Sequence, residues 1–175
     1  MKFLHRIKNK IKRYNLILNG AKIGHNSIIY YSVDIQNASS IKIGENSILY
    51  KNISIYASKN GLFEIKDNSH IAPYCYFLVE DMQVIIGNDV AIGPYCSFFC
   101  VSNSSKGKNL FRQNYTKGSI EIGNNVFIGS HCVVLPGTRI QSDVVVAANS
   151  VVLGELLSGY IYSGSPAIAV KKIEQ

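Results

Sequence analysis

IGNNVFIGSHCVVLPGTRIQSDVVVAANSVV, residues 122–152, is the stretch of this sequence that decides the fold. An aliphatic residue returns at every sixth position, at Ile122, Ile128, Val134, Ile140, Val146 and Val152. A small or branched residue follows four positions later, at Val126, Cys132, Thr138, Val144 and Ser150. Neither a helix, with a period of about 3.6, nor a strand, with a period of about 2, produces sixes. A three-sided parallel β-helix does, because each face takes six residues and the coils stack roughly 4.8 Å apart.

The same period extends towards the N-terminus as triplets of apolar residues at six-residue intervals. These triplets are Ile23, Ile29, Ile35; Ile43, Leu49, Ile55; Ile65, Ile71, Phe77; and Ile86, Ile92, Phe98. The steps between triplets slightly exceed eighteen residues, which predicts small bulges at the corners. We therefore expect an all-β protein in which residues 21–153 form one parallel β-helix domain. Of the 175 residues, 47% are apolar, which is enough for the core of one domain.

One long segment breaks the repeat between Phe98 and Ile120. It reads CVSNSSKGKNLFRQNYTKGS, residues 100–119, and is polar and out of period. We expect it to leave the coil as a long external loop over about residues 99–119, and long loops in compact domains are usually functional. After residue 153 the pattern stops, which predicts a C-terminal tail over residues 154–175.

Residues 1–20 predict an amphipathic basic helix. Apolar residues recur at helical spacing, at Phe3, Ile7, Ile11, Tyr14 and Leu18. The net charge of +7 is concentrated here, since no acidic residue precedes Asp34. Two interpretations stay open: the helix caps the open end of the β-helix, or residues 1–18 contact an anionic membrane surface. We find no nucleic-acid-binding motif and expect no nucleic acid as a partner.

The cysteines predict a core role. Cys75, Cys96 and Cys132 each lie four residues after an inward Ile, and their spacing matches no zinc site, so we expect no metal. Cys100, near the start of the loop, is the cysteine expected to be exposed. No secretory signal or membrane span is recognisable in the sequence, which favours a cytoplasmic protein with reduced thiols.

Three segments together resemble a known family. They are VIIGNDVAIGPYCSFF (residues 84–99), IEIGNNVFIGSHCVVLPGTRI (120–140) and YSGSPAIAVKKI (162–173). The chain over about residues 65–172 is similar to the left-handed β-helix acyltransferases, in the branch of the maltose, galactoside and polysaccharide O-acetyltransferases. The resemblance implies left-handed coils, a homotrimer, acetyl-CoA as co-substrate bound between subunits, and a sugar or sugar-nucleotide acceptor.

The resemblance also implies roles for single residues. Ser130 matches a position that touches the cofactor, Ala148 one whose backbone contacts the pantetheine arm, and Lys171 a basic residue that meets the nucleotide phosphates. In each case a plain structural role is the alternative, as a corner residue, a repeat residue or a solvated charge.

The expected base position departs from the family pattern. The family has a His nine residues after the Pro of the Ile-Gly-Pro segment, and here that position is Asn103. Asn103 lies between Ser102 and Ser104, which we expect to contact the substrate, and an amide cannot accept a proton. His131 and His70 are therefore the other candidates for the base, and His131 is expected to stack under the outward Tyr74 and Tyr95.

Two acidic residues precede the loop root by one coil. Glu80 and Asp81 are expected to orient a substrate hydroxyl or ammonium, with solvated corner charges as the alternative. Three functions stay open. The first is O-acetylation of a sugar in a bacterial surface polysaccharide or its precursor. The second is N-acetylation of a nucleotide-linked amino sugar, and the third a non-catalytic hexapeptide trimer.

The outward aromatic residues support an oligomer. They are more numerous than a monomer usually leaves in water, which predicts a homotrimer that partly buries Tyr30, Tyr31, Tyr50, Tyr56, Tyr74, Tyr76, Tyr95 and Phe127.

Overall fold

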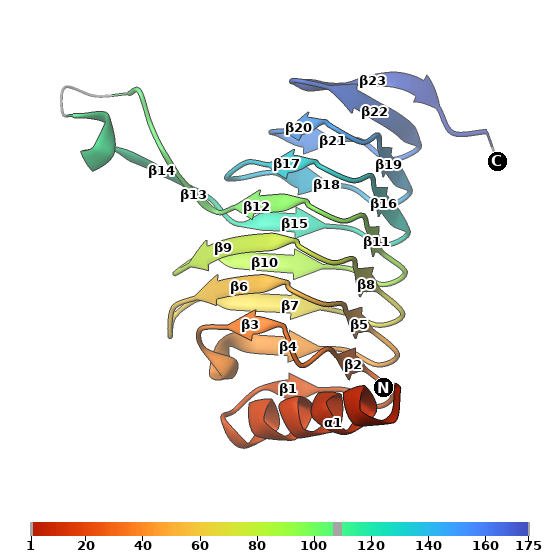
Figure 1. Ribbon diagram of the computed structural model, residues 1–175. Coiled ribbons are helices and arrows are strands. Elements are labelled where there is room, and N and C mark those ends of the chain that lie inside the picture. Colours follow the sequence, from red (N-terminus) through yellow and green to blue (C-terminus); the bar gives the residue numbers. More distant parts are fainter. Residues whose placement is uncertain (1, 107–109, 175) are drawn as a thin grey trace.

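The computed structural model describes residues 2–106 and 110–174, so residue 1, residues 107–109 of the expected loop and residue 175 of the expected tail lie outside the described residues. The chain winds into a parallel β-helix with a helix across one end, as Figure 1 shows. Each coil adds one short strand to each of three parallel faces. This confirms the β-helix, the N-terminal helix and the projecting loop that the sequence predicts.

The three faces are named here by their strands. Face A consists of β1 (Lys22–Ile23), β4 (Ile41–Ile43), β7 (Leu62–Ile65), β10 (Gln83–Ile86), β15 (Ile120–Ile122), β18 (Arg139–Ile140) and β21 (Glu155–Leu156). Face B consists of β2 (Ile28–Ile29), β5 (Ile48–Leu49), β8 (His70–Ile71), β11 (Ala91–Ile92), β16 (Val126–Ile128), β19 (Val144–Val146), β22 (Tyr160–Gly164) and β23 (Ala167–Lys172). Face C consists of β3 (Asp34–Ile35), β6 (Ser54–Ala57), β9 (Tyr76–Glu80), β12 (Ser97–Phe99), β17 (Val133–Val134) and β20 (Val151–Val152). A short 3-10 helix, η1 (Ala38–Ser40), forms one of the corner insertions.

Equivalent residues of successive coils lie directly over one another. Ile86 pairs with Ile65 below and with Ile122 above, and all three side chains point inward and are buried. Phe77 and Phe98 stack with their ring centroids 4.5 Å apart at the centre of the core. The six-residue period therefore converts directly into columns of like side chains.

The small inward residues hydrogen-bond as well as pack. The Ser47 hydroxyl donates to the carbonyl of Lys66 at 2.6 Å, and the Ser69 hydroxyl donates to the carbonyl of Gly87 at 2.9 Å. The thiols of Cys96 and Cys132 donate to the carbonyls of Gly129 and Ala147 of the next coil, at 3.1 and 3.2 Å. Each bond satisfies a corner carbonyl that the strand ladders leave unpaired.

Cys100 differs from its prediction. It was expected to be exposed because it opens the loop, but its exposed fraction is 0% and its thiol donates to the carbonyl of Gln83 at 3.6 Å. The alternation of β12 explains this: Phe98 points inward, so the residue two positions later does too. Burial raises the pKa of the Cys100 thiol to about 12.

Helix α1 (Lys2–Leu18) covers the first coil mainly through polar contacts. One guanidinium nitrogen of Arg13 donates to the carbonyls of Ile23 and Gly24, both at 3.2 Å, and the Tyr31 N–H donates to Asn9 Oδ1 at 3.0 Å. These bonds satisfy backbone groups that have no coil beneath them. Among the described residues, no helix combines the length and the apolar character needed to cross a bilayer.

The coil continues past residue 153, where the tail was expected to begin. Strand β21 pairs with β18, and β22 pairs with β19, both in parallel. Strand β23 then turns back antiparallel to β22 and ends face B. The β-helix thus continues to Gly164. Leu156 and Tyr162, six residues apart, are its buried inward residues, but the step from Val152 to Leu156 is only four residues and interrupts the sequence pattern.

Candidate functional site

The external loop is a β-hairpin arm that projects from the stack at the end of β12 (Figure 1). Strands β13 (Val101–Asn103) and β14 (Tyr115–Lys117) pair antiparallel, with Ser102 opposite Thr116. A short 3-10 helix, η2 (Phe111–Gln113), precedes β14. The apolar side chains of the arm at Leu110, Phe111 and Tyr115 are exposed, so the arm presents an uncovered apolar surface.

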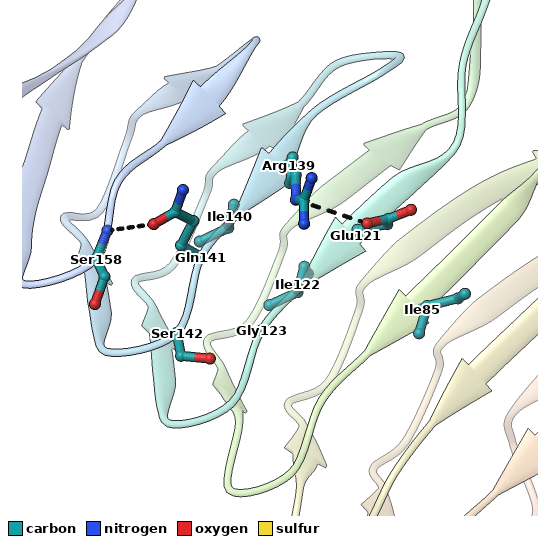
Figure 2. A pocket seen from close by; sticks show the side chains of 9 residues that line it. All are labelled: Ile85, Glu121, Ile122, Gly123, Arg139, Ile140, Gln141, Ser142 and Ser158. Carbon is teal, nitrogen blue, oxygen red and sulfur yellow. Dashed lines mark hydrogen bonds and ion pairs between the residues drawn. The ribbon is translucent and has the colours of Figure 1, made fainter.

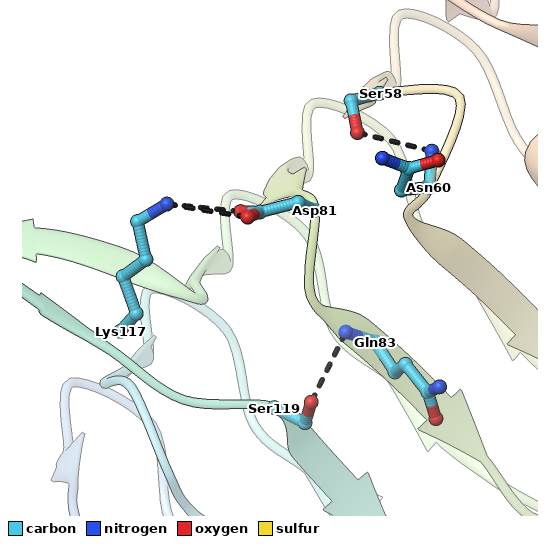
Figure 3. Close-up of polar contacts among 6 residues, drawn as sticks. All are labelled: Ser58, Asn60, Asp81, Gln83, Lys117 and Ser119. Atoms are coloured by element: carbon cyan, nitrogen blue, oxygen red, sulfur yellow. Dashed lines mark hydrogen bonds and ion pairs between the residues drawn. The ribbon is translucent and has the colours of Figure 1, made fainter.

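The loop root is fastened to the preceding coil. Figure 3 shows Lys117 Nζ beside the carboxylate of Asp81, at 3.0 Å from Oδ1, and the N–H of Gln83 donating to Ser119 Oγ at 3.1 Å. The hydrogen bond from Lys117 lowers the pKa of Asp81. Asp81 therefore pairs with the returning strand of the loop, which is a different use from the substrate contact expected of it.

Asn103 lies at the end of β13 and turns its side chain into the loop. Its Nδ2 donates to the carbonyl of Phe111 at 3.0 Å. Ser102 is half-buried, and the Ser104 hydroxyl accepts a hydrogen bond from the Lys106 N–H at 3.1 Å. These residues shape the hairpin, and Asn103 has no ionisable group to act as a base.

Glu80 sits at the corner between faces C and A, one coil before the loop root. It is exposed, and its φ of 54° lies in the left-handed region. The bulge at this point sets Ala57 opposite Glu80, and the Glu80 carbonyl accepts a hydrogen bond from the Ser58 N–H at 2.8 Å. Glu80 is thus an exposed corner residue, and its contact with a substrate stays a prediction.

His131 belongs to a stack of rings at the corner between faces B and C. Its imidazole lies 4.9 Å from the Tyr95 ring with an interplanar angle of 9°, and Tyr95 lies 5.0 Å from Tyr74 at 3°. The stack predicted from the repeat is confirmed. The positive φ of His131, 58°, is shared by Asn52 and Asn149 at the same corner, so it is a property of the turn.

Two of the three predicted cofactor residues, Ser130 and Ala148, lie close to this stack. Ser130 is half-buried and Ala148 is exposed, and the Asn149 N–H donates to the Ser130 carbonyl at 2.9 Å, so they occupy neighbouring coils of one corner. Lys171 lies on β23 opposite Ile161, towards the other end of face B, and its Nζ is 3.0 Å from Glu174 Oε1. Lys171 is therefore on the last layer of the stack, and the length of β22 separates it from the B–C corner.

His70 lies elsewhere. It occupies the outward row of face B, between Ile48 and Ala91, and meets the Tyr50 ring edge-on with centroids 6.2 Å apart. One chain therefore holds three separate groups: His70 on face B, the His131 stack with Ser130 and Ala148 at the B–C corner, and Asn103 at the loop root.

The B–C corner and the loop root lie at opposite edges of face C. Tyr95 precedes β12 and Val101 follows it, so six residue steps, or roughly 20 Å of extended chain, separate them. The structure of one chain does not bring His131 and Asn103 together. A reaction that used both would need the loop of one chain beside the corner of another.

A groove of about 570 Å³ on face A holds none of these residues. Figure 2 shows it lined by Ile85, Ile122 and Ile140 with polar side chains around them. Glu121 and Arg139 are 3.8 Å apart, so the charges of this groove compensate each other. The groove lies between adjacent strands of face A, and its residues do not indicate a catalytic site.

Sequence reasoning missed Lys117. The residue stands in a polar loop, where a single cation carries no signal by itself. The clue available was its place in the returning half of the loop, which had to come back to the coil carrying Asp81. Pairing of β13 with β14, with Val101 opposite Lys117, is what fixes that return.

Comparison with known proteins finds one matching family and several similar proteins. The family described as bacterial transferase hexapeptide (six repeats) matches residues 119–154. Galactoside O-acetyltransferase of Escherichia coli K12 is 31% identical over 121 residues, which are 63% of this chain and 57% of that protein. WbbJ of the same organism, named as a lipopolysaccharide biosynthesis O-acetyl transferase, is 30% identical over 154 residues, 83% of this chain and 78% of that protein.

A solved structure agrees with the fold. A single-site variant of AntD, an N-acyltransferase from Bacillus cereus in complex with dTDP and coenzyme A, superposes with a TM-score of 0.81 and 25% identity over 93% of this chain and 90% of that one. The chain spans a little over half the length of the galactoside enzyme and more than three quarters of WbbJ. The hexapeptide repeat, the shared fold and the similarity to WbbJ confirm the predicted family. The chain belongs to the bacterial hexapeptide-repeat transferases.

Proposed function

We propose that this protein transfers the acetyl group of acetyl-CoA to a hydroxyl of a bacterial surface-polysaccharide sugar or of its precursor. The observation that carries the proposal is the similarity to WbbJ, which extends over 83% of this chain. It is strengthened by the expelled hairpin arm. Acetyl-CoA is a cytoplasmic metabolite, so the reaction belongs in the cytoplasm.

The reaction sets clear chemical needs. A base removes the hydroxyl proton as the oxygen attacks the thioester carbonyl carbon, and a donor stabilises the developing oxyanion. The tetrahedral intermediate then expels the coenzyme A thiolate, which takes up a proton, and leaves the acetyl ester on the sugar. A slot for the long pantetheine arm completes the list.

The B–C corner is the place we propose for the pantetheine arm. Ser130 is half-buried and Ala148 is exposed there, and successive coils repeat the backbone at a regular spacing along the corner. Lys171, on the last layer, supplies a cation for the nucleotide phosphates. We therefore propose that acetyl-CoA lies along this corner with its phosphates towards β23.

His131 is the better candidate for the base. It adjoins Ser130, its ring is held by the stack on Tyr95, and its outer face is exposed. His70 lies on face B, away from both the corner and the loop. Glu80, at the other edge of face C, then serves to bind acceptor hydroxyls, together with Ser102 and Ser104 of the loop.

The separation of the corner from the loop root supports a homotrimer. If subunits associate side by side, the hairpin arm of one chain reaches the His131 corner of its neighbour, and the two halves form one site. The exposed rings of Tyr74, Tyr95 and Phe127, and the apolar tip of the arm, give such contacts an apolar surface to bury.

The first measurement is acetyl-CoA binding by calorimetry. We expect about one site per chain and a dissociation constant raised about tenfold in Lys171→Ala, since one charge-assisted contact is lost. Lys66→Ala, an exposed lysine on a distant corner, is the matched control. Absence of binding in the parent protein would contradict the proposal.

The second measurement is the rate of thiol release from acetyl-CoA with sugar acceptors. Loss of a general base costs at least about a hundredfold, so His131→Ala should lower kcat/KM by that much. His70→Ala and the exposed His25→Ala should act like the parent protein. Full activity in His131→Ala would show that the base is assigned wrongly.

N-acetylation of a nucleotide-linked amino sugar is the second candidate. It is favoured by Asn103, whose amide donates into the loop and cannot act as a base, and by the likeness to the N-acyltransferase AntD. A sugar amine with a pKa below that of Lys is partly neutral at pH 7 and needs little help to attack a thioester. In this case an amino sugar is acetylated, its hydroxyl analogue is not, and His131→Ala keeps its rate.

A non-catalytic trimer is the remaining outcome of the same assays. The parent protein would then release no thiol with any acceptor. Asn103→His, which restores the family residue, would distinguish a lost base from a lost site, because only the former regains turnover.

A further inference from the structure

Helix α1 carries an apolar stripe that faces away from the protein. At 100° per residue, one arc of about 100° contains Phe3, Leu4, Ile7, Ile11, Tyr14 and Leu18. These side chains are exposed, from 39% for Ile7 to 77% for Phe3. Leu16, on the opposite side of the helix, is only 6% exposed and is the apolar residue of α1 that reaches the core.

The contacts on the inner side explain this unusual orientation. Arg13, Asn9 and His5 face the first coil, where the first two hydrogen-bond its backbone groups and the His5 ring stacks on Tyr31 at 5.5 Å. The helix therefore caps the β-helix with its polar side. This arrangement leaves the apolar stripe of α1 without a partner among the described residues, which argues for an external one.

Basic residues border the stripe. Residues 2–18 include six lysines and arginines and no acidic residue. Arg6 and Lys10 line a groove of about 730 Å³ between α1 and β2, together with Asn26 and Ser27 of the first coil. Among the described residues, none in α1 takes part in an ion pair. Arg13 caps the first coil and Lys8 lies over the Tyr31 ring at 5.2 Å, so Arg6 and Lys10 are the cations offered to an anionic partner.

We propose that the outer side of α1 docks the protein on the surface of an anionic phospholipid bilayer. An apolar stripe flanked by cations suits a helix lying in the plane of the interface, with the stripe among the acyl chains and the cations at the headgroups. A helix of 17 residues is about 26 Å long and gives one line of contact. The groove at Arg6 and Lys10 receives a lipid phosphate.

The position of α1 suits this role. It lies across one end of the stack, whereas the hairpin arm and β23 lie towards the middle and the opposite end (Figure 1). A protein docked through α1 keeps the loop and the B–C corner in the aqueous phase. Charge favours lipid over a second copy of the helix, because two such helices would repel each other.

The test is co-sedimentation of the full chain with vesicles of phosphatidylcholine, alone or with about one third phosphatidylglycerol. We expect binding to the anionic vesicles to exceed binding to the neutral ones by about tenfold and to weaken in high salt. The double variant I7E/I11E should lose about tenfold or more of this binding. L153E/L157E, two exposed leucines near the opposite end, should bind like the parent protein.

A second set of variants tests the charges: R6E/K10E, with K59E/K66E as a control of equal net charge. The first should abolish the preference for anionic vesicles, and the second should keep most of it. Circular dichroism and acetyl-CoA affinity report whether each variant retains its fold. The proposal is overturned if the parent binds neither vesicle, if I7E/I11E binds unchanged, or if I7E/I11E lowers the molecular mass in solution, which would assign the stripe to a contact between copies.

Discussion

The inward side chains show how much single residues contribute to this fold. Every coil places a large apolar residue and a small one inside, and the small ones include thiols and hydroxyls that donate to the next coil. Their identity is therefore set by two requirements, a limited volume and a hydrogen-bond donor. Thiols held in this way serve the core.

Cys100 provides a test of this conclusion through pH. Its pKa is about 12 in the fold and about 8.5 when unfolded, so it favours the fold fully below pH 8.5 and loses that effect as the pH rises towards 12. In Cys100→Ala, the fall of the unfolding free energy above pH 9 should be smaller by up to about 1.4 kcal/mol per pH unit. The loss at neutral pH should be only about 1 kcal/mol. Urea unfolding at several pH values measures both, and equal slopes would contradict the assignment.

Gly129 provides a second test at this scale, through the close approach of coils. A Cβ built on it would lie 2.5 Å from the nitrogen of Ala148 in the next coil. Gly129→Ala should therefore cost about 3 kcal/mol of unfolding free energy, as in an overpacked core. Gly137→Ala meets no atom within 4 Å, and its φ of 78° costs about 1 kcal/mol. Thermal or urea unfolding compares them, and equal losses would show that the coils can separate.

At the scale of elements, the hairpin arm depends on contacts at its root. Among the described residues, strands β13 and β14 pair only with each other, and the root is fastened by Lys117 to Asp81 and by Ser119 to Gln83 (Figure 3). The coils on both sides of the projecting loop are in register, with Val84 paired to Ile120. The arm is therefore an independent insertion whose direction is set by a few polar bonds.

Asp81→Asn should loosen the arm without changing the core. The pair is exposed, so the melting temperature should stay within about 1 °C, while trypsin cleavage after Arg112 should accelerate about threefold. Glu121→Gln, which removes an exposed ion pair with Arg139 on face A, is the matched control and should leave cleavage unchanged. Slow cleavage in Asp81→Asn would mean that hairpin pairing alone fixes the arm.

On the scale of the whole molecule, apolar side chains on the outside of the β-helix are only partly covered by other parts of the protein. Face B carries an outward row that includes Ile28, Ile48, Phe127 and Val145, and the stacked rings lie beside it. An apolar outer row on a solenoid favours contact with another copy. Side-by-side contact also brings the two separated halves of the candidate site together.

Assembly is tested by light scattering during gel filtration. We expect about 58 kDa, three times the 19.3 kDa of one chain. Tyr95→Glu, in the ring stack, should shift the mass towards 19.3 kDa, and Tyr14→Glu, on the outer side of α1, should leave it unchanged. A monomer at micromolar concentration in the parent protein would contradict the trimer and, with it, the shared site.

The sequence by itself determined the coils, the place of the projecting loop and the ring stack. These follow from the six-residue period, because a repeat that fixes which side chains point inward also fixes which positions of successive coils lie over one another. His131 under Tyr95 is a direct consequence. Cys100 shows that even the first loop residue still obeys the alternation of the strand before it.

Only the tertiary structure decided where the unrepeated parts go. The side of α1 that meets the core depends on the unpaired groups of the first coil, which Arg13 and Asn9 satisfy. The pairing of Asp81 with Lys117 joins residues 36 positions apart through a hairpin, and the coil continues to Gly164 after a four-residue step from Val152 to Leu156. Such features arise from contacts between distant segments, and the six-residue repeat does not predict those contacts.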